Sequence, residues 1–216
     1  MTINDLREKG YKEVEKTLTT LKANIFGAIV TIPIVVLAFM VFYIVRREKG
    51  MTDVNLITVI IVTGLLIVVH ELIHGGTWVI FCKDGWKSIK FGVEWKYLTP
   101  YCHCKEILEI NRYRLGTIMP LIITGIIPYI ISLTLGNTTL LFIAVVMISG
   151  AAGDILMFIL LLNEKRGTLV MDHPTNVGCI LYRPENNRER NNEEKEGTNT
   201  ESNEGTGVEG ITSNNV

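Results

Sequence analysis

The chain has 216 residues, of which 48% are hydrophobic, a formal net charge of −1 and a mean hydropathy of +0.30. Its basic residues form no general basic surface of the kind that nucleic acid requires, so we exclude nucleic acid as a partner. The apolar residues lie in four long runs with the charge between and after them. Because about 20 apolar residues cross the hydrocarbon core of a bilayer, we expect an all-α membrane protein in contact with membrane lipid.

Residues 1–22 place apolar side chains at roughly helical spacing between lysines and glutamates: Leu6, Tyr11, Val14, Leu18 and Leu21. This pattern predicts an amphipathic helix on the membrane surface, and a solvated lead-in helix fits it nearly as well. No cleavage site with small residues follows a short apolar core, so we expect the first apolar run to be a retained anchor.

Four membrane spans follow in chain order, at about residues 23–45, 54–81, 115–135 and 140–162, within a membrane domain of residues 23–183. Pro33 is tolerated in the first span, because neighbouring helices can satisfy the carbonyl that it frees. Pro120 and Pro128 predict kinks in the third span. A tight turn, "GNTT", joins the third span to the fourth.

The lysines and arginines predict the orientation, because cytoplasmic segments carry an excess of them. Residues 1–22 have five, residues 82–114 have seven and the C-terminal part has six. The turn at 136–139 has none, and the first connection has three, Arg46, Arg47 and Lys49, which argue against the assignment. We expect a multi-pass protein of the cell membrane with both termini in the cytoplasm.

Residues 82–114 include a polar segment in which apolar side chains alternate at Ile89, Phe91, Val93, Trp95 and Tyr97. Period-two alternation followed by "YLTPYCHC" predicts a short cytoplasmic β-hairpin. Residues 184–216 are rich in Asn, Glu, Gly, Thr and Ser, so we expect a disordered tail.

The stretch "VVHELIHGG" places His70, Glu71 and His74 inside the second span, where each unpaired ionisable group costs about 2.5–3.5 kcal/mol on the mildest scale. His70 and His74 are four apart and therefore share one helix face, so both can reach one metal ion. Glu71 lies close enough to take a proton from a water held there. A chance match and polar residues satisfied between helices are the alternatives.

Asp154 is the candidate third metal ligand, because it is the only ionisable residue in the fourth span. In the orientation above, its depth agrees with that of His74 to within about 2 Å. Small residues stand beside both positions, Gly75 and Gly76 in one span and "GAAG" in the other, so the helices can approach closely. A hydrogen bond between helices without metal remains the alternative.

The other histidines and cysteines give weaker signals. Cys82, Cys102, Cys104 and Cys179 could form one or two disulfides, but the predicted cytoplasmic side keeps thiols reduced. A second metal site at "CHC" is disfavoured because His103 would face away from the two flanking cysteines in a strand. A local turn explains His173 best, and a contact with substrate stays open. The tryptophans at 78, 86 and 95 and the tyrosines at 97 and 101 are typical of the membrane interface.

The stretches "HELIHG", "YLTPYCHCKE", "YRLGTIMP", "SGAAGD" and "DHPTNVGC" resemble a group of bacterial membrane proteins of unknown function described as "putative zincin peptidases", over about residues 5–183. More distantly, the chain is similar to the site-2-protease class of intramembrane zinc metalloproteases. That resemblance implies zinc ligation by His70, His74 and Asp154, with Glu71 as the catalytic base. The context here is Gly-Asp-Ile, where the wider class has Leu-Asp-Gly.

Together these features predict a zinc-dependent intramembrane endopeptidase acting on a protein or peptide substrate. Val93 and Trp95 would hold the substrate as an added strand at the hairpin edge, and His173 is a further substrate-binding candidate. The alternative is a non-catalytic metal-binding membrane protein with a sensing, structural or transport role. We see no internal repetition of spans, which a transporter would be expected to show.

Overall fold

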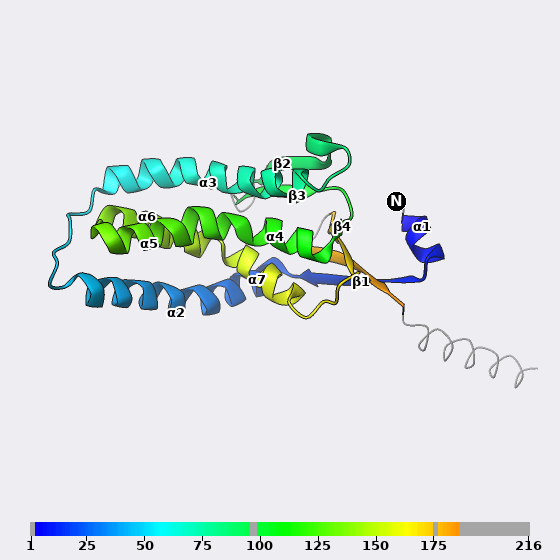
Figure 1. The fold of residues 1–216 in the computed structure, drawn as a ribbon, viewed down its shortest axis with the longest axis horizontal. Coiled ribbons are helices and arrows are strands. Elements are labelled where there is room, and N and C mark those ends of the chain that lie inside the picture. Colours follow the sequence, from blue (N-terminus) through cyan, green and yellow to red (C-terminus); the bar gives the residue numbers. More distant parts are fainter. Residues whose placement is uncertain (1–2, 96–98, 175–176, 186–216) are drawn as a thin grey trace, which may run out of the picture. The chain divides into compact units, whose positions relative to one another are not determined.

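The computed structural model describes residues 3–95, 99–174 and 177–185 (Figure 1). It divides into two compact units, Met1–Lys12 with Arg183–Val216, and Glu13–Tyr182. The first unit contains helix α1 (Ile3–Glu8) and a backbone hydrogen bond of 2.8 Å from Glu185 to Gly10. The predictions for Tyr97 and for the tail beyond residue 185 lie outside the described residues.

The second unit contains the long apolar helices. They are α2 (Thr20–Arg46), α3 (Leu56–Val79), α4 (Ile110–Pro120), the π-helical segment η2 (Leu121–Ile126), α5 (Ile127–Leu135), α6 (Thr138–Gly150) and α7 (Ala152–Leu161). Figure 1 shows α2, α3 and the α4–α5 stretch running alongside one another. Many large apolar side chains of α2 and α3 face outward, as lipid contact requires.

Within the described residues, three helical stretches are long and apolar enough to span a membrane: Ile25–Arg46, Leu56–Val79 and Ile110–Leu135. The predicted fourth span is a pair of helices, α6 and α7, bent by 48° at their junction. The chain is therefore a multi-pass membrane protein with three spans, or four if the bent pair crosses as one. The bend falls at Ala151, so that Asp154 lies in the first turn of α7.

The third predicted span is irregular between the two prolines at which kinks were predicted. The two prolines, Pro120 and Pro128, leave one continuous 26-residue span with a π-helical segment between them. Proline lacks the N–H that closes an α-helical turn, so the regular bonding is interrupted at both positions, and between them the N–H of Ile127 bonds the Ile122 carbonyl, five residues back. The "GNTT" turn agrees with expectation, since Gly136 ends α5 in the left-handed region and Asn137 caps α6.

In the part of the chain that the structure describes, six strands accompany the helices: β1 (Tyr11–Leu18), β2 (Ile89–Glu94), β3 (Thr99–Cys104), β4 (Leu108–Glu109), β5 (Leu169–Asp172) and β6 (Val177–Pro184). The short 3₁₀ helix η1 (Gly85–Ser88) leads into β2. β2 and β3 form the predicted hairpin, with Phe91 opposite Cys102. The other four strands form an antiparallel sheet in the order β1-β6-β5-β4.

The fold is mostly helical, as expected, and beside the predicted hairpin it has a second antiparallel sheet that was not expected. One expectation is wrong: residues 11–18 form a strand rather than part of an amphipathic helix. Val14 and Leu18 are four apart, and residues at that spacing share a face in a helix and in a strand alike. Pairing with β6, more than 150 residues away, selects the strand.

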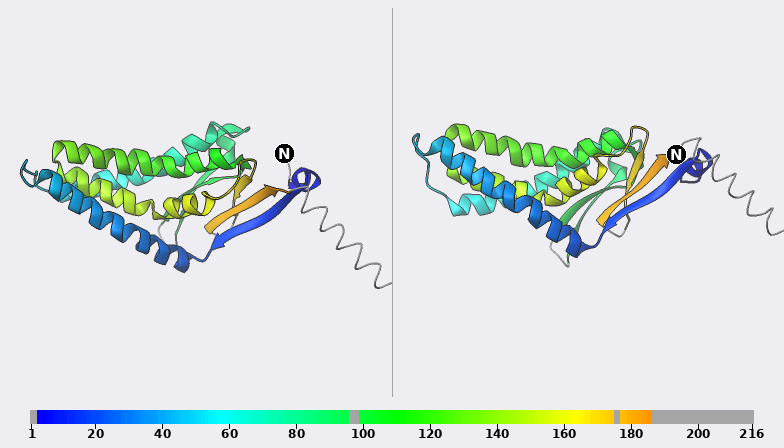
Figure 2. Two further views of the ribbon diagram at one scale, coloured as in Figure 1. Left: turned by 60° about the horizontal axis from the view of Figure 1, so that its bottom comes forward. Right: turned by 90° about the horizontal axis from the view of Figure 1, so that it is seen from below.

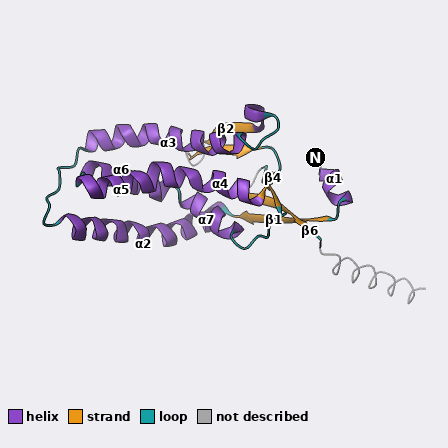
Figure 3. Cartoon of the chain, viewed as in Figure 1, coloured by secondary structure: helices purple, strands orange, loops and turns teal. Residues whose placement is uncertain are grey.

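The main core of this unit joins the helix ends to the strands. It contains Trp78 of α3, Tyr113 of α4 and Leu161 of α7, packed with Val170 and Leu181 of the sheet. Figures 2 and 3 show the strands of this unit gathered at one end of its helices. The same end carries the C-terminal third of α3, which holds the histidine motif.

Candidate metal centre

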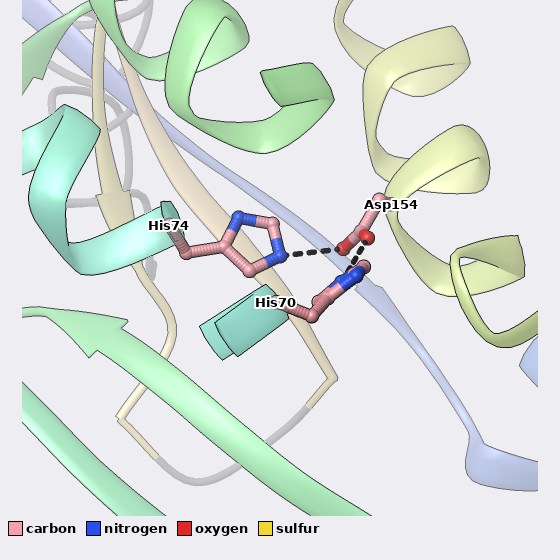
Figure 4. Close-up of side chains that lie close together, drawn as sticks. All are labelled: His70, His74 and Asp154. Atoms are coloured by element: carbon pink, nitrogen blue, oxygen red, sulfur yellow. Dashed lines mark hydrogen bonds and ion pairs between the residues drawn. The ribbon is translucent and has the colours of Figure 1, made fainter. Parts of the chain in front are cut away.

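Three ionisable side chains meet between α3 and α7 (Figure 4). His70 Nε2 lies 2.9 Å from Asp154 Oδ2, and His74 Nε2 lies 3.2 Å from Asp154 Oδ1. One ligand atom from each of the three residues lies within 4.8 Å of the other two. The grouping expected from the sequence is therefore present, with both imidazoles pointing at the carboxylate.

The local structure explains why these three side chains converge. His70 and His74 stand one turn apart on α3, with ring centroids separated by 5.0 Å. Asp154 lies in the first turn of α7, where the positive end of the helix dipole favours a carboxylate. The bend of 48° at Ala151 turns α7 away from the direction of α6.

The small residues act differently from expectation. A Cβ on Gly75 would lie 2.6 Å from the Phe91 ring, so this glycine makes room for the hairpin rather than for α7. Gly76, Gly150 and Gly153 have open space at the Cβ position. The tightest approach to α3 is at Gly116 of α4, where a Cβ would lie 2.0 Å from Trp78 Nε1.

Each imidazole is also held through its second nitrogen. His74 Nδ1 lies 2.9 Å from the Gly116 carbonyl, which can only accept a hydrogen bond. His70 Nδ1 lies 3.5 Å from Thr124 Oγ1, and the Thr124 hydroxyl already donates to the Pro120 carbonyl at 2.8 Å. Both Nδ1 atoms are therefore the donors, and in the neutral imidazoles both Nε2 atoms carry lone pairs.

The donor set fits a divalent cation. The two Nε2 lone pairs face carboxylate oxygens at 2.9 and 3.2 Å. Both kinds of atom are hydrogen-bond acceptors, so they repel each other unless a proton or a cation lies between them. Two imidazoles and one carboxylate form a ligand set of catalytic zinc sites, which keep a fourth position open. An imidazole whose other nitrogen donates to a carbonyl is the usual arrangement of a metal-bound histidine.

Glu71 lies beside this group and does not belong to it. Its side chain is half-buried on α3, and the backbone N–H of Cys102 in β3 hydrogen-bonds its carboxylate. The hairpin thus holds the residue expected to act as the base. Among the described residues, the only group of three or more His, Cys, Asp or Glu side chains that could hold a metal ion is the one at His70, His74 and Asp154.

Trp78 is part of the site rather than a marker of the membrane interface. It is 4% exposed and stacks between the rings of His74 and Tyr113, each 5.3 Å away. Its Nε1 donates to the Tyr113 carbonyl at 3.1 Å. Trp86 and Trp95 are exposed, and their place at the membrane interface stays a prediction.

The expected substrate-binding residues lie on or beside strands β2 and β5. Val93 is in β2, and Trp95 follows it with 77% of its surface exposed. His173 follows β5, and its Nε2 lies 4.0 Å from a Glu15 carboxylate oxygen in β1. The cysteines are free thiols, and Cys82 Sγ lies 3.6 Å from Cys104 Sγ.

Asp172 is a buried acidic residue whose importance the sequence did not indicate. It accepts hydrogen bonds from the Tyr113 hydroxyl and, at 2.7 Å, from the backbone N–H of Cys104. Burial raises the pKa of Asp172 above its ordinary value of 3.8, and these hydrogen bonds oppose the rise. Asp172 thereby ties the hairpin to α4, which supports the rings behind His74.

Comparisons with known proteins agree with this site. No curated protein and no solved structure matches the chain. The stretch that matches a family begins in α3 and ends at β5, so the expected resemblance over residues 5–183 is found over a shorter range that leaves "DHPTNVGC" outside. It includes His70, Glu71, His74 and Asp154, and over residues 63–169 the chain matches the family described as "Putative zincin peptidase".

Proposed function

We propose that this protein is a zinc-dependent intramembrane endopeptidase. The observation that carries the proposal is the convergence of His70, His74 and Asp154 between helices of a membrane protein, with Glu71 alongside. A site of this composition inside apolar helices needs a positive charge to offset the cost of burying it. The family match over residues 63–169 supports the peptidase assignment.

Zinc held by these three residues would lower the pKa of water to about 7 and polarise a peptide carbonyl. Glu71 would take the proton of the attacking water and deliver it to the leaving amine nitrogen. Its hydrogen bond from Cys102 fixes the carboxylate against the hairpin, so that it stays beside the metal ligands. The three ligating side chains are largely shielded, with exposures of 10%, 7% and 21%.

The substrate in this proposal is an extended segment of a membrane or membrane-proximal protein that adds to the outer edge of β2. The outward N–H groups of β3 at Cys102 and Cys104 already bond Glu71 and Asp172, and Pro100 has none. β2 has no second strand neighbour among the described residues. By the register, the N–H of Val93 points toward this outer edge.

Val93→Pro tests this docking, because it removes an outward N–H and leaves the ladder to β3 intact. We expect lost cleavage with metal content unchanged, and the same for Trp95→Pro if the added strand extends to that residue. Glu94→Pro is the contrasting variant, since Glu94 pairs inward with Thr99 and its loss should disrupt the hairpin itself. Normal cleavage by Val93→Pro would remove the edge from the proposal. His173→Ala tests the remaining substrate candidate in the same assay.

We also propose that both termini lie in the cytoplasm, as the distribution of lysine and arginine favours. Glu48→Cys and Asp84→Cys place thiols at exposed positions before and after α3. In intact cells, a membrane-impermeant maleimide should label the first variant and not the second. The reverse pattern would invert the orientation.

The deciding experiment compares wild type with Glu71→Gln in reconstituted vesicles. A dye-labelled unfolded polypeptide and a set of single-span peptides serve as substrates, and mass spectrometry identifies cleaved bonds. Catalysis predicts cleavage by wild type, loss of at least about 100-fold in Glu71→Gln, and equal zinc content in both. Equal cleavage by both proteins would overturn the proposed role of Glu71, and zinc binding without any cleavage would favour a sensing, structural or transport role.

A further inference from the structure

The irregular part of the third span supplies the outer partners of both imidazoles, which are the groups next to the Nδ1 atoms of His70 and His74. In a regular α-helix the Gly116 carbonyl would accept from the N–H of residue 120, which is a proline and has none. The next N–H, that of Leu121, bonds the Ile118 carbonyl. The Gly116 carbonyl is therefore left to accept from His74 Nδ1, 2.9 Å away.

The second outer partner lies inside the π-helical segment. Thr124 is 2% exposed, and its hydroxyl donates to the Pro120 carbonyl at 2.8 Å. With its hydrogen committed there, Thr124 Oγ1 can act toward His70 Nδ1, 3.5 Å away, only as an acceptor. The Pro120 carbonyl thus sets the direction of the hydroxyl lone pairs that His70 meets.

We propose that Pro120 and Thr124 are positioning residues of the metal centre, which hold His74 and His70 with hydrogen on Nδ1 and the Nε2 lone pairs toward Asp154. This inference rests on the proposed function. Outer partners of this kind typically change metal affinity by about 10–100-fold. A proline and a π-helical turn, both in the third span, thus position the two histidines of α3.

The test measures zinc affinity of the purified full-length chain in detergent by competition with a chromophoric chelator, and it does not depend on cleavage. Thr124→Val keeps the shape and removes the acceptor, and we expect about 10–100-fold weaker binding. Thr124→Ser restores the hydroxyl and should restore the affinity to within about threefold. Thr63→Val in α3 is the matched control, because among the described residues Thr63 Oγ1 is buried without a hydrogen-bond partner.

Pro120→Ala returns an N–H that can reclaim the Gly116 carbonyl, so zinc should again bind about 10–100-fold more weakly. Pro33→Ala, at a proline inside α2, is its control and should bind zinc as wild type does. The thermal midpoint of the metal-free protein, measured alongside, separates lost positioning from lost folding.

Wild-type affinity in Thr124→Val, or equal weakening in Thr124→Ser, would overturn the inference while leaving the metal site intact. Failure of the wild type itself to bind zinc would overturn the proposed function, and the inference with it. A Thr124→Val protein that unfolds before it can be titrated is replaced by Thr124→Ala, for which the same loss and the same rescue by serine are expected.

Discussion

Gly116 lies directly against the Trp78 indole, and Gly116→Ala tests the packing behind the candidate metal centre. The added Cβ would lie 2.0 Å from Trp78 Nε1 and 2.2 Å from Cδ1, far inside contact distance. The indole cannot move freely, because it stacks on His74 and Tyr113 and donates to the Tyr113 carbonyl. Overpacking of this kind costs about 1–3 kcal/mol.

For a chain of this length, a loss of that size lowers the thermal midpoint by about 2–12 °C. The displaced Trp78 would also push on the His74 ring, so zinc affinity should fall together with stability. Differential scanning fluorimetry and the chelator competition measure the two effects on one preparation. Gly64→Ala in α3 is the matched control, since a Cβ there meets nothing within 4 Å and should be neutral or slightly stabilising. Equal midpoints for Gly116→Ala and Gly64→Ala would refute the packing described around Trp78.

Three further predictions concern groups outside the candidate metal centre. Between 3.8 and the raised pKa of Asp172, the folded chain holds a proton that the unfolded chain has released, so wild-type stability should fall as the pH rises through that window. Asp172→Asn should lack this contribution in chemical unfolding, and parallel pH profiles for the two proteins would contradict the assignment. Cys179 is fully buried, and burial raises the pKa of its thiol to about 12, so iodoacetamide at pH 8 should leave it unmodified in the folded protein; rapid labelling detected by mass spectrometry would count against this burial. Arg114 donates to the carbonyls of Leu161, Leu162 and Glu164 at the end of α7, so Arg114→Ala should lower the unfolding free energy by about 1.5–3 kcal/mol. Arg47→Ala, at an exposed arginine, should leave it within about 0.5 kcal/mol of wild type, and equal effects would refute the capping role.

The grouping of His70, His74 and Asp154 could be predicted from sequence because the relevant rules are local. Two histidines four apart share a helix face. A single aspartate in an apolar run must face the protein interior and pair with another polar group there. Counting residues from the ends of the second and fourth spans, in the orientation that the lysines and arginines predict, then brings Asp154 to the depth of His74. The hairpin was predictable for the same reason, since the alternation from Ile89 onward has period two.

The parts that escaped prediction depend on contacts between distant segments. Val14 and Leu18 fit a helix and a strand equally, and only pairing with β6 distinguishes them. Trp78 looks like an interface residue until Gly116, nearly 40 residues later, is found to make room for it. The proline at position 120 was a usable signal, because it has no N–H to bond the carbonyl four residues earlier, that of Gly116.

The strands at the end of the helices also contribute contacts to the site. β3 reaches Glu71 through the N–H of Cys102, and Asp172 fixes the same strand through Cys104. Sequence periodicity indicated a hairpin at the surface, but not that its edge supports the proposed base. The hairpin is tied to α3 through Glu71 and to α4 through Asp172. These ties explain how Glu71 can keep a fixed distance from His70 and His74, which lie on the adjacent face of α3.

The metal content of the purified protein tests the central claim most directly. Elemental analysis of the detergent-solubilised wild type should give about one zinc ion per chain, as three protein ligands with one open position require. Asp154→Ala should lose most of this zinc, whereas Asp84→Ala, which removes an exposed carboxylate outside the group, should keep it. Equal zinc in all three proteins, or none in the wild type, would contradict a metal centre at His70, His74 and Asp154.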